Sequence, residues 1–435
     1  MLFRIFIFLL PLLCFAELKL GYQDVISRAM KHGRKALVLT EQNKVADYSY
    51  SASRKGLQPI FSAESNYQTA QDSTGHLNIS QKFAAGTSAT LAFDLFHNKD
   101  TSLTLTQPLL NGYGINGLNL LNAKNTYQQA NITWLVSVQG IIQDVLNAYW
   151  NVISAEKNIE VQLLAKESAK RLYEQYKIKY NMGSLPRSNL VEQNAQLARI
   201  QLEELQQNTA KRQAKQLLKV MINVPNDQLI KLTGKLDINV FGKMPSLKSV
   251  LKQVSKNNPN IALAKLALDA ADYNYKIALN SAKAQLNLTA TMQKDIGASV
   301  GLSVNVPIND PTLKQQVVSA KSALFQAKIN LQQTSQDNLQ LASNTWQELA
   351  SKVKENQLLK NNLATSKKLY ELSITQYKYG KASSLDVVTR QKTLVSDQQA
   401  LISNTISYLQ DFIKLCGLEG ALLRLFGIDK RISYV

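Results

Sequence analysis

The chain has 435 residues, enough for two or three domains of ordinary size. It carries 50 lysine and arginine residues against 31 acidic ones, a net charge of +19. Such a charge is compatible with nucleic-acid binding, but no arginine-rich stripe or aromatic stacking motif accompanies it. The basic residues are scattered along segments rich in Asn and Gln, which indicates a solvated polar surface.

Residues 1–16 predict a secretory signal peptide, because Arg4 precedes an apolar core and Ala16 ends a small-residue cleavage site. Lipidation of Cys14 is the alternative, although Leu13 is bulkier than that processing favours. Cleavage leaves 49 basic against 31 acidic residues, a charge of +18, and the single cysteine Cys416. One thiol cannot form an intramolecular disulfide. No later segment has the roughly 18 consecutive apolar residues of a membrane-spanning helix, and we expect an exported protein.

The sequence is duplicated. Residues 45–50 (VADYSY) return as 270–275 (AADYNY), and most of the pattern of 172–183 returns 197 positions later at 369–380. Two repeats of about 200 residues are too long for solenoid units, so a duplicated domain is expected. The predicted organisation is a first repeat at 17–228, a linker at 229–245, a second repeat at 246–420 and a C-terminal tail at 421–435.

Each repeat begins with a helix, predicted at 22–55 and 246–282, and continues into extended segments. These segments, at 57–110 and 284–307, alternate apolar with small polar residues, as half-buried strands do. The first repeat holds about 28 residues more than the second, all in this region, and a further hairpin is expected around Gly86.

Very long helices follow, predicted at 115–181 and 314–379, each about 100 Å long at 1.5 Å per residue. Patterns of this length indicate a coiled coil or helical array. Each helix breaks at a glycine, Gly183 or Gly380, and a return helix follows at 186–222 or 384–416. Ser383 is the expected N-cap of the second return helix, in a capping box with Asp386. Ser184 is its expected counterpart, with Pro186 in the first turn.

Gly112–Gly117 matches a dinucleotide-binding fingerprint, but the ribose-binding acid and second strand that should follow are missing. The glycines are better explained by an elbow where a strand turns into a helix, and Pro108, Gly112 and Pro307 are the expected elbow residues. The three histidines are scattered and no nucleophile motif occurs. The sequence therefore predicts no enzyme, no metal site and no cofactor.

Asp386 has two interpretations. As part of a capping box, it needs only the electrostatics of a helix start to explain it. Alternatively it lies at the tip of a helical hairpin, where copies from several subunits would form a ring around a pore.

The duplicated helix–strands–long helix–helix halves, the Gln107–Gly112 elbow and the Tyr-x-x-Gly-x-x-Ser-x-Asp break resemble the TolC-type outer-membrane efflux protein family. The resemblance covers about residues 18–420. It implies a mainly α-helical homotrimer in which four strands from each subunit form a 12-stranded outer-membrane β-barrel, continued by a long periplasmic α-helical barrel.

The resemblance also implies a function. Such proteins are exit ducts in the outer membrane of Gram-negative bacteria, for tripartite efflux or type I secretion. They export small molecules or proteins, contact outer-membrane lipid, and dock with a periplasmic adaptor (membrane fusion protein) and an inner-membrane transporter. Nucleic acid is not a partner.

Within the resemblance, Gly183 and Gly380 fall at the periplasmic turns, and Asp386 matches the carboxylate of the pore constriction. Thr389 stands where some members have a second acidic residue, and Asn189 where the first-half acid would be. The constriction is thus expected to carry less negative charge than in those members, and we hypothesise a preference for anionic cargo.

The residues alone point the same way, because a few strands from one chain cannot close a barrel in lipid, so the chain is expected to oligomerise. A periplasmic coiled-coil adaptor or stalk protein is the main alternative; it leaves the strand segments unexplained. An exported enzyme is a third possibility, but the sequence contains no recognisable set of catalytic residues. Aromatic residues of the strand region fit either a barrel girdle or an ordinary core: Phe61, Tyr67, Phe93 and Phe96. The sequence does not identify the cargo.

Overall fold

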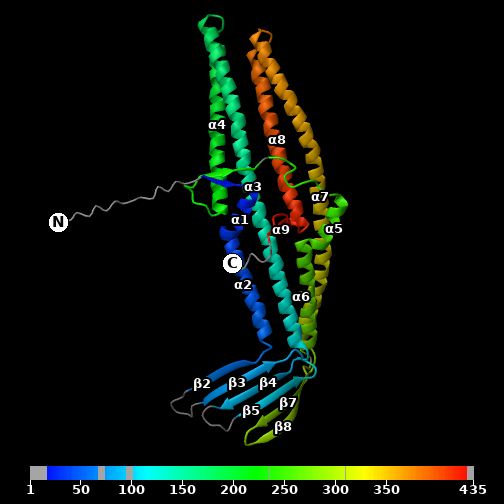
Figure 1. Ribbon diagram of the computed structural model, residues 1–435. Coiled ribbons are helices and arrows are strands. Elements are labelled where there is room, and N and C mark those ends of the chain that lie inside the picture. Colours follow the sequence, from blue (N-terminus) through cyan, green and yellow to red (C-terminus); the bar gives the residue numbers. More distant parts are fainter. Residues whose placement is uncertain (1–16, 67–73, 95–100, 235, 309, 429–435) are drawn as a thin grey trace, which may run out of the picture. The chain divides into compact units, whose positions relative to one another are not determined.

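The computed structural model describes residues 17–66, 74–94, 101–234, 236–308 and 310–428 (Figure 1). The signal peptide with Cys14, Tyr67, Phe96 and the last residues of the tail lie outside these ranges. The chain forms two compact units, each assembled from segments of both repeats. Unit 1 comprises Met1–Val38, Val138–Val250 and Ala342–Val435, and unit 2 comprises Leu39–Ser137 and Leu251–Leu341.

Helices dominate the described chain, with a smaller part in strands. The helices are α1 (Tyr22–His32), α2 (Arg34–Lys55), α3 (Ile115–Asn181), α4 (Arg187–Met221), α5 (Leu247–Asn257), α6 (Pro259–Ser281), α7 (Pro311–Lys378), α8 (Ser384–Leu418) and α9 (Leu422–Leu425). The strands are β1 (Leu18–Leu20), β2 (Ile60–Asn66), β3 (Thr74–Lys82), β4 (Ser88–Asp94), β5 (Ser102–Pro108), β6 (Ile230–Leu232), β7 (Gln285–Gln293) and β8 (Gly297–Asn305). The mainly α fold with a small β part is therefore confirmed.

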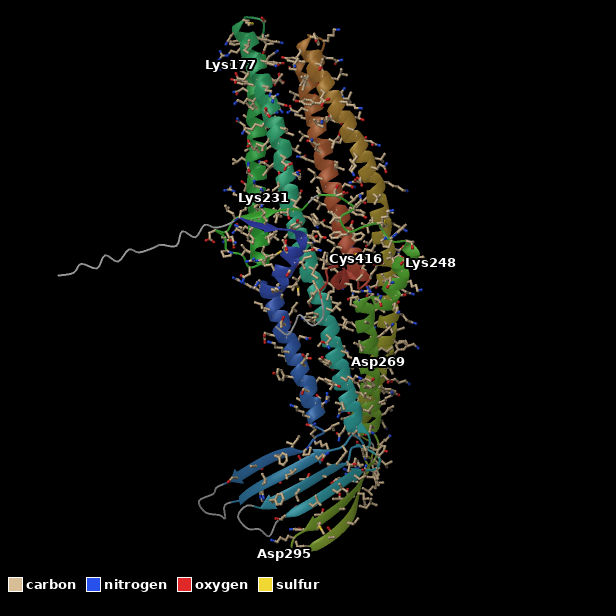
Figure 2. All side chains as sticks on the ribbon, viewed as in Figure 1. Lys177, Lys231, Lys248, Asp269, Asp295 and Cys416 are labelled. Carbon is tan, nitrogen blue, oxygen red and sulfur yellow. The ribbon has the colours of Figure 1, made fainter. Side chains whose placement is uncertain are left out.

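The long helices α3 and α7 have 67 and 68 residues, since neither segment contains an internal proline to end it. In unit 1 they form two hairpins with the return helices α4 and α8. The hydrophobic core of this unit includes Tyr149 and Trp150, both fully buried, and the aromatic rings of Trp150, Phe241 and Phe412 lie in contact. Cys416 is also buried here (Figure 2), and burial raises the pKa of its thiol to about 12.

The predicted helix 22–55 is wrong in one respect, because the structure divides it into α1 and α2 at Gly33. Gly33 has an extended backbone, and its amide still donates to the Ala29 carbonyl. A Cβ at this position would lie 2.2 Å from that carbonyl oxygen and 3.0 Å from the Met221 oxygen, so only glycine fits.

The predicted helix 246–282 is likewise divided, into α5 and α6. Pro259 lacks an amide proton and occupies the first turn of α6, where its missing hydrogen bond costs nothing. Asn258 caps this helix by accepting a hydrogen bond from the Ile261 amide. The proline and the capping asparagine are both visible in the sequence. The apolar pattern continues across them, so one helix was expected instead of two.

Unit 2 contains a six-stranded antiparallel sheet in the order β2-β3-β4-β5-β7-β8 (Figure 1). The hairpin expected around Gly86 is present as β3 and β4. The sheet thus has two strands more than the four per subunit that the resemblance implied for the barrel, because the extra residues of the first repeat form the β3–β4 hairpin. A second, two-stranded sheet, in unit 1, pairs β1 with β6 in parallel. The sequence gives no sign of it, because three-residue strands are too short to show a period.

No helix in the described ranges is both long enough and apolar enough to cross a lipid bilayer.

We predict that Trp150→Ala destabilises the protein by about 3–5 kcal/mol, because it leaves a large cavity in the fully buried core of unit 1. Thermal unfolding of the purified full-length protein would show the loss as a lower melting temperature. Tyr379→Ala is the control, since Tyr379 is 77% exposed and its removal should leave the melting temperature nearly unchanged. Equal melting temperatures for the two variants would contradict the assignment of this core.

Candidate functional site

The ends of the two helical hairpins are built alike. Gly183 and Gly380 have φ of 72° and 73°, a left-handed conformation that glycine adopts without strain. The next residue in each case donates its amide to a carbonyl five residues earlier, Ser184 to Lys179 and Lys381 to Gln376. This pattern closes the last turn of each long helix. The two glycines thus end α3 and α7 at equivalent positions of the repeat.

The second return helix begins with the predicted capping box. The Ser383 hydroxyl accepts from the Asp386 amide at 3.2 Å, and the Asp386 carboxylate accepts from the Ser383 amide at 2.8 Å. The Ser383 hydroxyl also donates to the carboxylate at 2.6 Å. These hydrogen bonds, with Arg390 nearby, lower the pKa of Asp386 below its ordinary value. Asp386 is therefore an exposed, ionised carboxylate at neutral pH.

The expected counterpart at Ser184 is wrong. The first return helix starts at Arg187, and its N-cap is Pro186, which has an extended backbone and offers no capping side chain. Ser184 instead belongs to the turn that ends α3. The two return helices are thus started by different chemistry, although their first residues are equivalent.

The remaining constriction candidates lie on the first turns of these helices. Asn189 is the third residue of α4, as Asp386 is of α8, and its side-chain oxygen accepts from the Ser188 hydroxyl at 3.3 Å. Thr389 is exposed one turn after Asp386. An ionised carboxylate on one hairpin thus corresponds to a neutral amide on the other.

Near the hairpin ends, a cluster of side chains joins the two repeats. Leu172, Tyr176 and Val388 are buried together, and the Tyr176 and Tyr377 rings stack at 6.3 Å. Lys179 Nζ lies 4.7 Å from the centre of the Tyr377 ring, which favours a cation. The repeat in the sequence identified Tyr377 as the counterpart of Tyr180, but it did not indicate that Tyr377 stacks on Tyr176.

Polar groups extend this contact between the repeats. The Tyr370 hydroxyl donates to the Ser168 hydroxyl at 2.7 Å, and the buried Gln391 amide donates to the Ala165 carbonyl at 2.8 Å. Sequence reasoning missed Gln391, because one buried amide on a helix rich in polar residues carries no distinguishing signal.

The strand-to-helix elbow in unit 2 is a hydrogen-bonded junction. Pro108 ends β5 and is buried under Gly112, whose φ is 94°. The Gly112 amide donates to the Asn280 side-chain oxygen at 2.7 Å, and the Asn280 amide group donates to the Tyr113 carbonyl at 3.1 Å. The glycine-rich segment thus joins β5, α3 and α6, and α3 follows it directly. This geometry is that of the elbow and not of a dinucleotide-binding loop.

The turn between β3 and β4 completes this elbow. The Gly114 amide donates to the Ala85 carbonyl at 2.8 Å, and the Gly117 amide donates to the Ala84 carbonyl at 3.1 Å. The first amides of a helix have no partner within it, and a turn carbonyl takes that role for Gly117, the third residue of α3, while Gly114 lies just before the helix. Gly86 approaches the Gly112 carbonyl so closely that a Cβ would lie 2.2 Å from that oxygen.

The second-repeat elbow is simpler. Pro307 is exposed after β8, and α7 begins at Pro311, three residues earlier than expected. Asp310 precedes the helix and accepts from the Thr312 amide at 2.8 Å, so it caps α7. The hydrogen bonds from Thr312 lower the pKa of Asp310.

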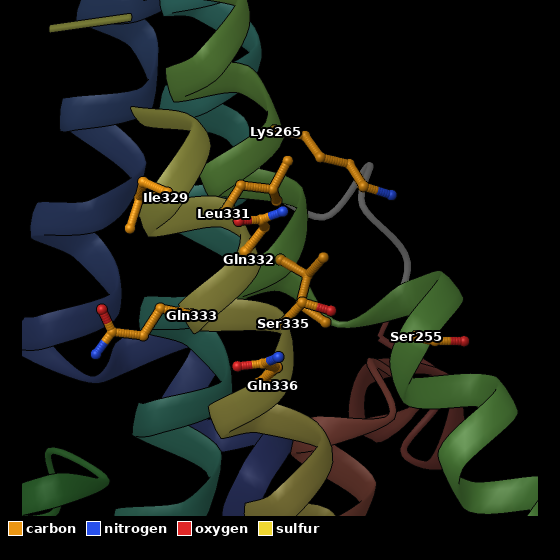
Figure 3. Close-up of a pocket in the computed structure, with 9 residues that line it drawn as sticks. Ser255, Lys265, Ile329, Leu331, Gln332, Gln333, Ser335 and Gln336 are labelled. Atoms are coloured by element: carbon orange, nitrogen blue, oxygen red, sulfur yellow. The ribbon is translucent and has the colours of Figure 1, made fainter. Parts of the chain in front are cut away.

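A pocket in unit 2 does not have the side-chain arrangement of a ligand site. This pocket, of about 630 Å³, is lined mainly by α7, which contributes glutamines, a serine and two aliphatic side chains, with Lys265 as its charged residue. Figure 3 shows that the labelled side chains do not point toward a common centre. Within the described ranges, no group of three or more His, Cys, Asp or Glu residues could hold a metal ion.

Residues 250–421 match the family model "Outer membrane efflux protein". The resemblance inferred from the sequence is thereby confirmed. The chain is 28% identical over 158 residues to the outer membrane efflux protein BepC of Brucella suis, an alignment that covers 34% of this chain and 35% of BepC. It is 21% identical over 346 residues to the outer membrane protein TolC of Escherichia coli, covering 74% of this chain and 69% of TolC.

The fold is also that of outer-membrane channels. The crystal structure of the Campylobacter jejuni CmeC outer membrane channel superposes with a TM-score of 0.70 at 15% identity, covering 92% of this chain and 86% of CmeC. Because the identity is so low, this likeness concerns the fold and does not extend to cargo or partners.

We predict that Ser383→Ala weakens the start of α8 by about 1 kcal/mol, because the hydroxyl that accepts from the Asp386 amide is lost. Hydrogen exchange of the first α8 amides should become faster. Ser184→Ala is the matched control and should leave the start of α4 unchanged, since that helix has no side-chain cap. Unaltered exchange in α8 would show that the capping box does not stabilise the helix.

Proposed function

We propose that this chain is an outer-membrane exit duct that exports small molecules or proteins from the periplasm of a Gram-negative bacterium. The observation that carries the proposal is a sheet with one apolar, exposed face in a chain whose long helical hairpins have the fold of efflux channels. The proposed partners are outer-membrane lipid, a periplasmic adaptor and an inner-membrane transporter. The signal peptide at 1–16 would direct export.

A periplasmic coiled-coil adaptor or stalk protein is not favoured. An adaptor or stalk of this kind does not explain a six-stranded sheet with exposed apolar side chains. Phe61 and Met292 of this sheet are 69% and 62% exposed. The matching family model is also that of an outer membrane efflux protein. The relatives named for efflux or channel activity likewise give no support to an enzymatic function.

The internal repeat supports the proposed homotrimer, because a contact between the two repeats of one chain has an equivalent that one chain alone leaves incomplete. Leu172 and Tyr176 of the first repeat are covered by Tyr377 and Val388 of the second. Adding 197 to the first pair and subtracting 197 from the second gives the equivalent positions, which are Leu369 and Ser373 on one side and Tyr180 and Val191 on the other; of these, Ser373 is buried within the chain.

Three of these equivalent positions carry exposed apolar side chains. Leu369 and Tyr180 are each 38% exposed and Val191 is 58% exposed, whereas Leu172 and Val388 are 7% and 8% exposed. A second copy placed head to tail would cover Leu369 with its own Val191. Head-to-tail contacts close into rings when the rotation allows it. The hydroxyl pair of Tyr370 and Ser168 has a matching pair in Tyr173 and Thr365.

Asp386, Thr389 and Asn189 are the proposed pore constriction. One ionised Asp386 per subunit would form a ring of negative charge, while the neutral Thr389 and Asn189 would add none. With a net charge of +18 after signal cleavage (49 basic against 31 acidic residues), this reduced ring would weaken cation preference and favour anionic cargo.

We predict that membrane-extracted protein migrates as a heat-modifiable trimer and conducts ions in planar bilayers. Reversal potentials in a salt gradient would report selectivity, and Asp386→Asn should shift it toward anions because it removes the ring charge. Ser383→Ala keeps that charge and is the matched control. A monomer confined to the periplasmic fraction would refute the exit duct, and an unshifted reversal potential would refute the role of Asp386.

We predict that Leu369→Cys combined with Val191→Cys gives covalent dimers and trimers on oxidation. Each single substitution should give none, and Leu172→Cys with Val388→Cys should link within one chain. The buried thiol of Cys416 stays protonated at neutral pH and adds little background. A native trimer without intersubunit disulfides would contradict the head-to-tail contact.

A further inference from the structure

The sheet of unit 2 is amphipathic across all six strands. One row of directly paired positions is apolar from edge to edge: Phe61, Ile79, Leu91, Leu103, Met292 and Ala298. The neighbouring row is polar from β3 to β8: Ser80, Thr90, Thr104, Thr291 and Ser299. Because side chains alternate between faces along a strand, these rows lie on opposite faces.

The β3–β4 hairpin is an integral part of this sheet and not a surface loop. It lies between β2 and β5, so the apolar row passes through Ile79 and Leu91 to reach Phe61. Its turn is fixed at the elbow by the hydrogen bonds from Gly114 and Gly117 to the turn carbonyls. The strands and the turn therefore occupy defined positions in the same sheet as β5 and β7.

Both edges of the sheet are unpaired within the described ranges. β2 pairs only with β3 and β8 only with β7, and each residue of β8 is exposed. An open edge is not tolerated in lipid, because its amides and carbonyls have no water to bind. Six strands are too few to close alone, since membrane barrels begin at about eight.

The direction of the strands suits closure between copies. All neighbours in the sheet are antiparallel, so β2 and β8 run in opposite directions. If copies were placed side by side around an axis, the β8 edge of one would therefore meet the β2 edge of the next in antiparallel fashion, and the same ladder would continue around the ring.

We propose that six strands from each of three copies close into a barrel of 18 strands, in which β8 of one copy pairs with β2 of the next. The proposal rests on the trimeric exit duct proposed above, and it replaces the 12 strands that the resemblance implied. Barrels of about 16–18 strands enclose an aqueous channel. The membrane opening of this duct is then wider than a 12-stranded barrel provides.

The test places cysteines on the hairpin of the full-length protein in lipid nanodiscs. Ile79→Cys and Leu91→Cys, labelled with an environment-sensitive fluorophore, should be quenched by spin-labelled lipid as strongly as Leu103→Cys in β5. Ser80→Cys and Thr90→Cys, on the same strands but the opposite face, should be quenched by aqueous iodide instead.

The outcomes separate this proposal from the function on which it rests. Lipid quenching at Leu103 but not at Ile79 and Leu91 would place the hairpin outside the membrane and overturn the 18-stranded barrel alone. Absence of lipid quenching at all three would overturn the outer-membrane duct as well. Electron microscopy of the trimer gives an independent count, for which 18 strands supports the proposal and 12 overturns it.

Discussion

The constraint on which this structure depends is the pairing of backbone amides and carbonyls at the edges of the sheet. Within one chain, β2 and β8 each have a neighbour on one side only, and in lipid an unpaired edge costs several kcal/mol per group. A helix pairs most of its backbone amides and carbonyls within itself, as α3 and α7 do along their length. The sheet cannot, and in the proposed trimer the need for further copies therefore originates in its strands.

The helical part of the fold could largely be predicted from the sequence, because the relevant signals are local. A lack of proline extended α3 to its expected bounds, and the Ser383–Asp386 box started α8 at Ser384 as the sequence predicted. Gly33 and Pro259 were visible too, but the apolar periodicity on both sides of them hid the breaks. Ser184 failed as a cap because Pro186 takes that position with an extended backbone.

The arrangement of the sheet and much of the site depend on contacts between distant residues. Nothing in the local pattern of 102–108 indicates that it pairs with 285–293. The stacking of Tyr176 on Tyr377 and the hydrogen bond from Gln391 to Ala165 join residues about 200 positions apart. The repeat in the sequence showed that Asp386 and Asn189 occupy equivalent positions. It could not predict which residues pack around them.

The start of α3 is joined by hydrogen bonds to the turn of the β3–β4 hairpin. The amide of Gly114, just before the helix, and that of Gly117, in its first turn, donate to carbonyls of the β3–β4 turn. An unfolded hairpin would leave these two amides without their partners, so the hairpin contributes to the free energy of forming the helix start. The extra hairpin of the first repeat therefore contributes to the stability of the longest helix of that repeat, at the end where the helix follows the sheet.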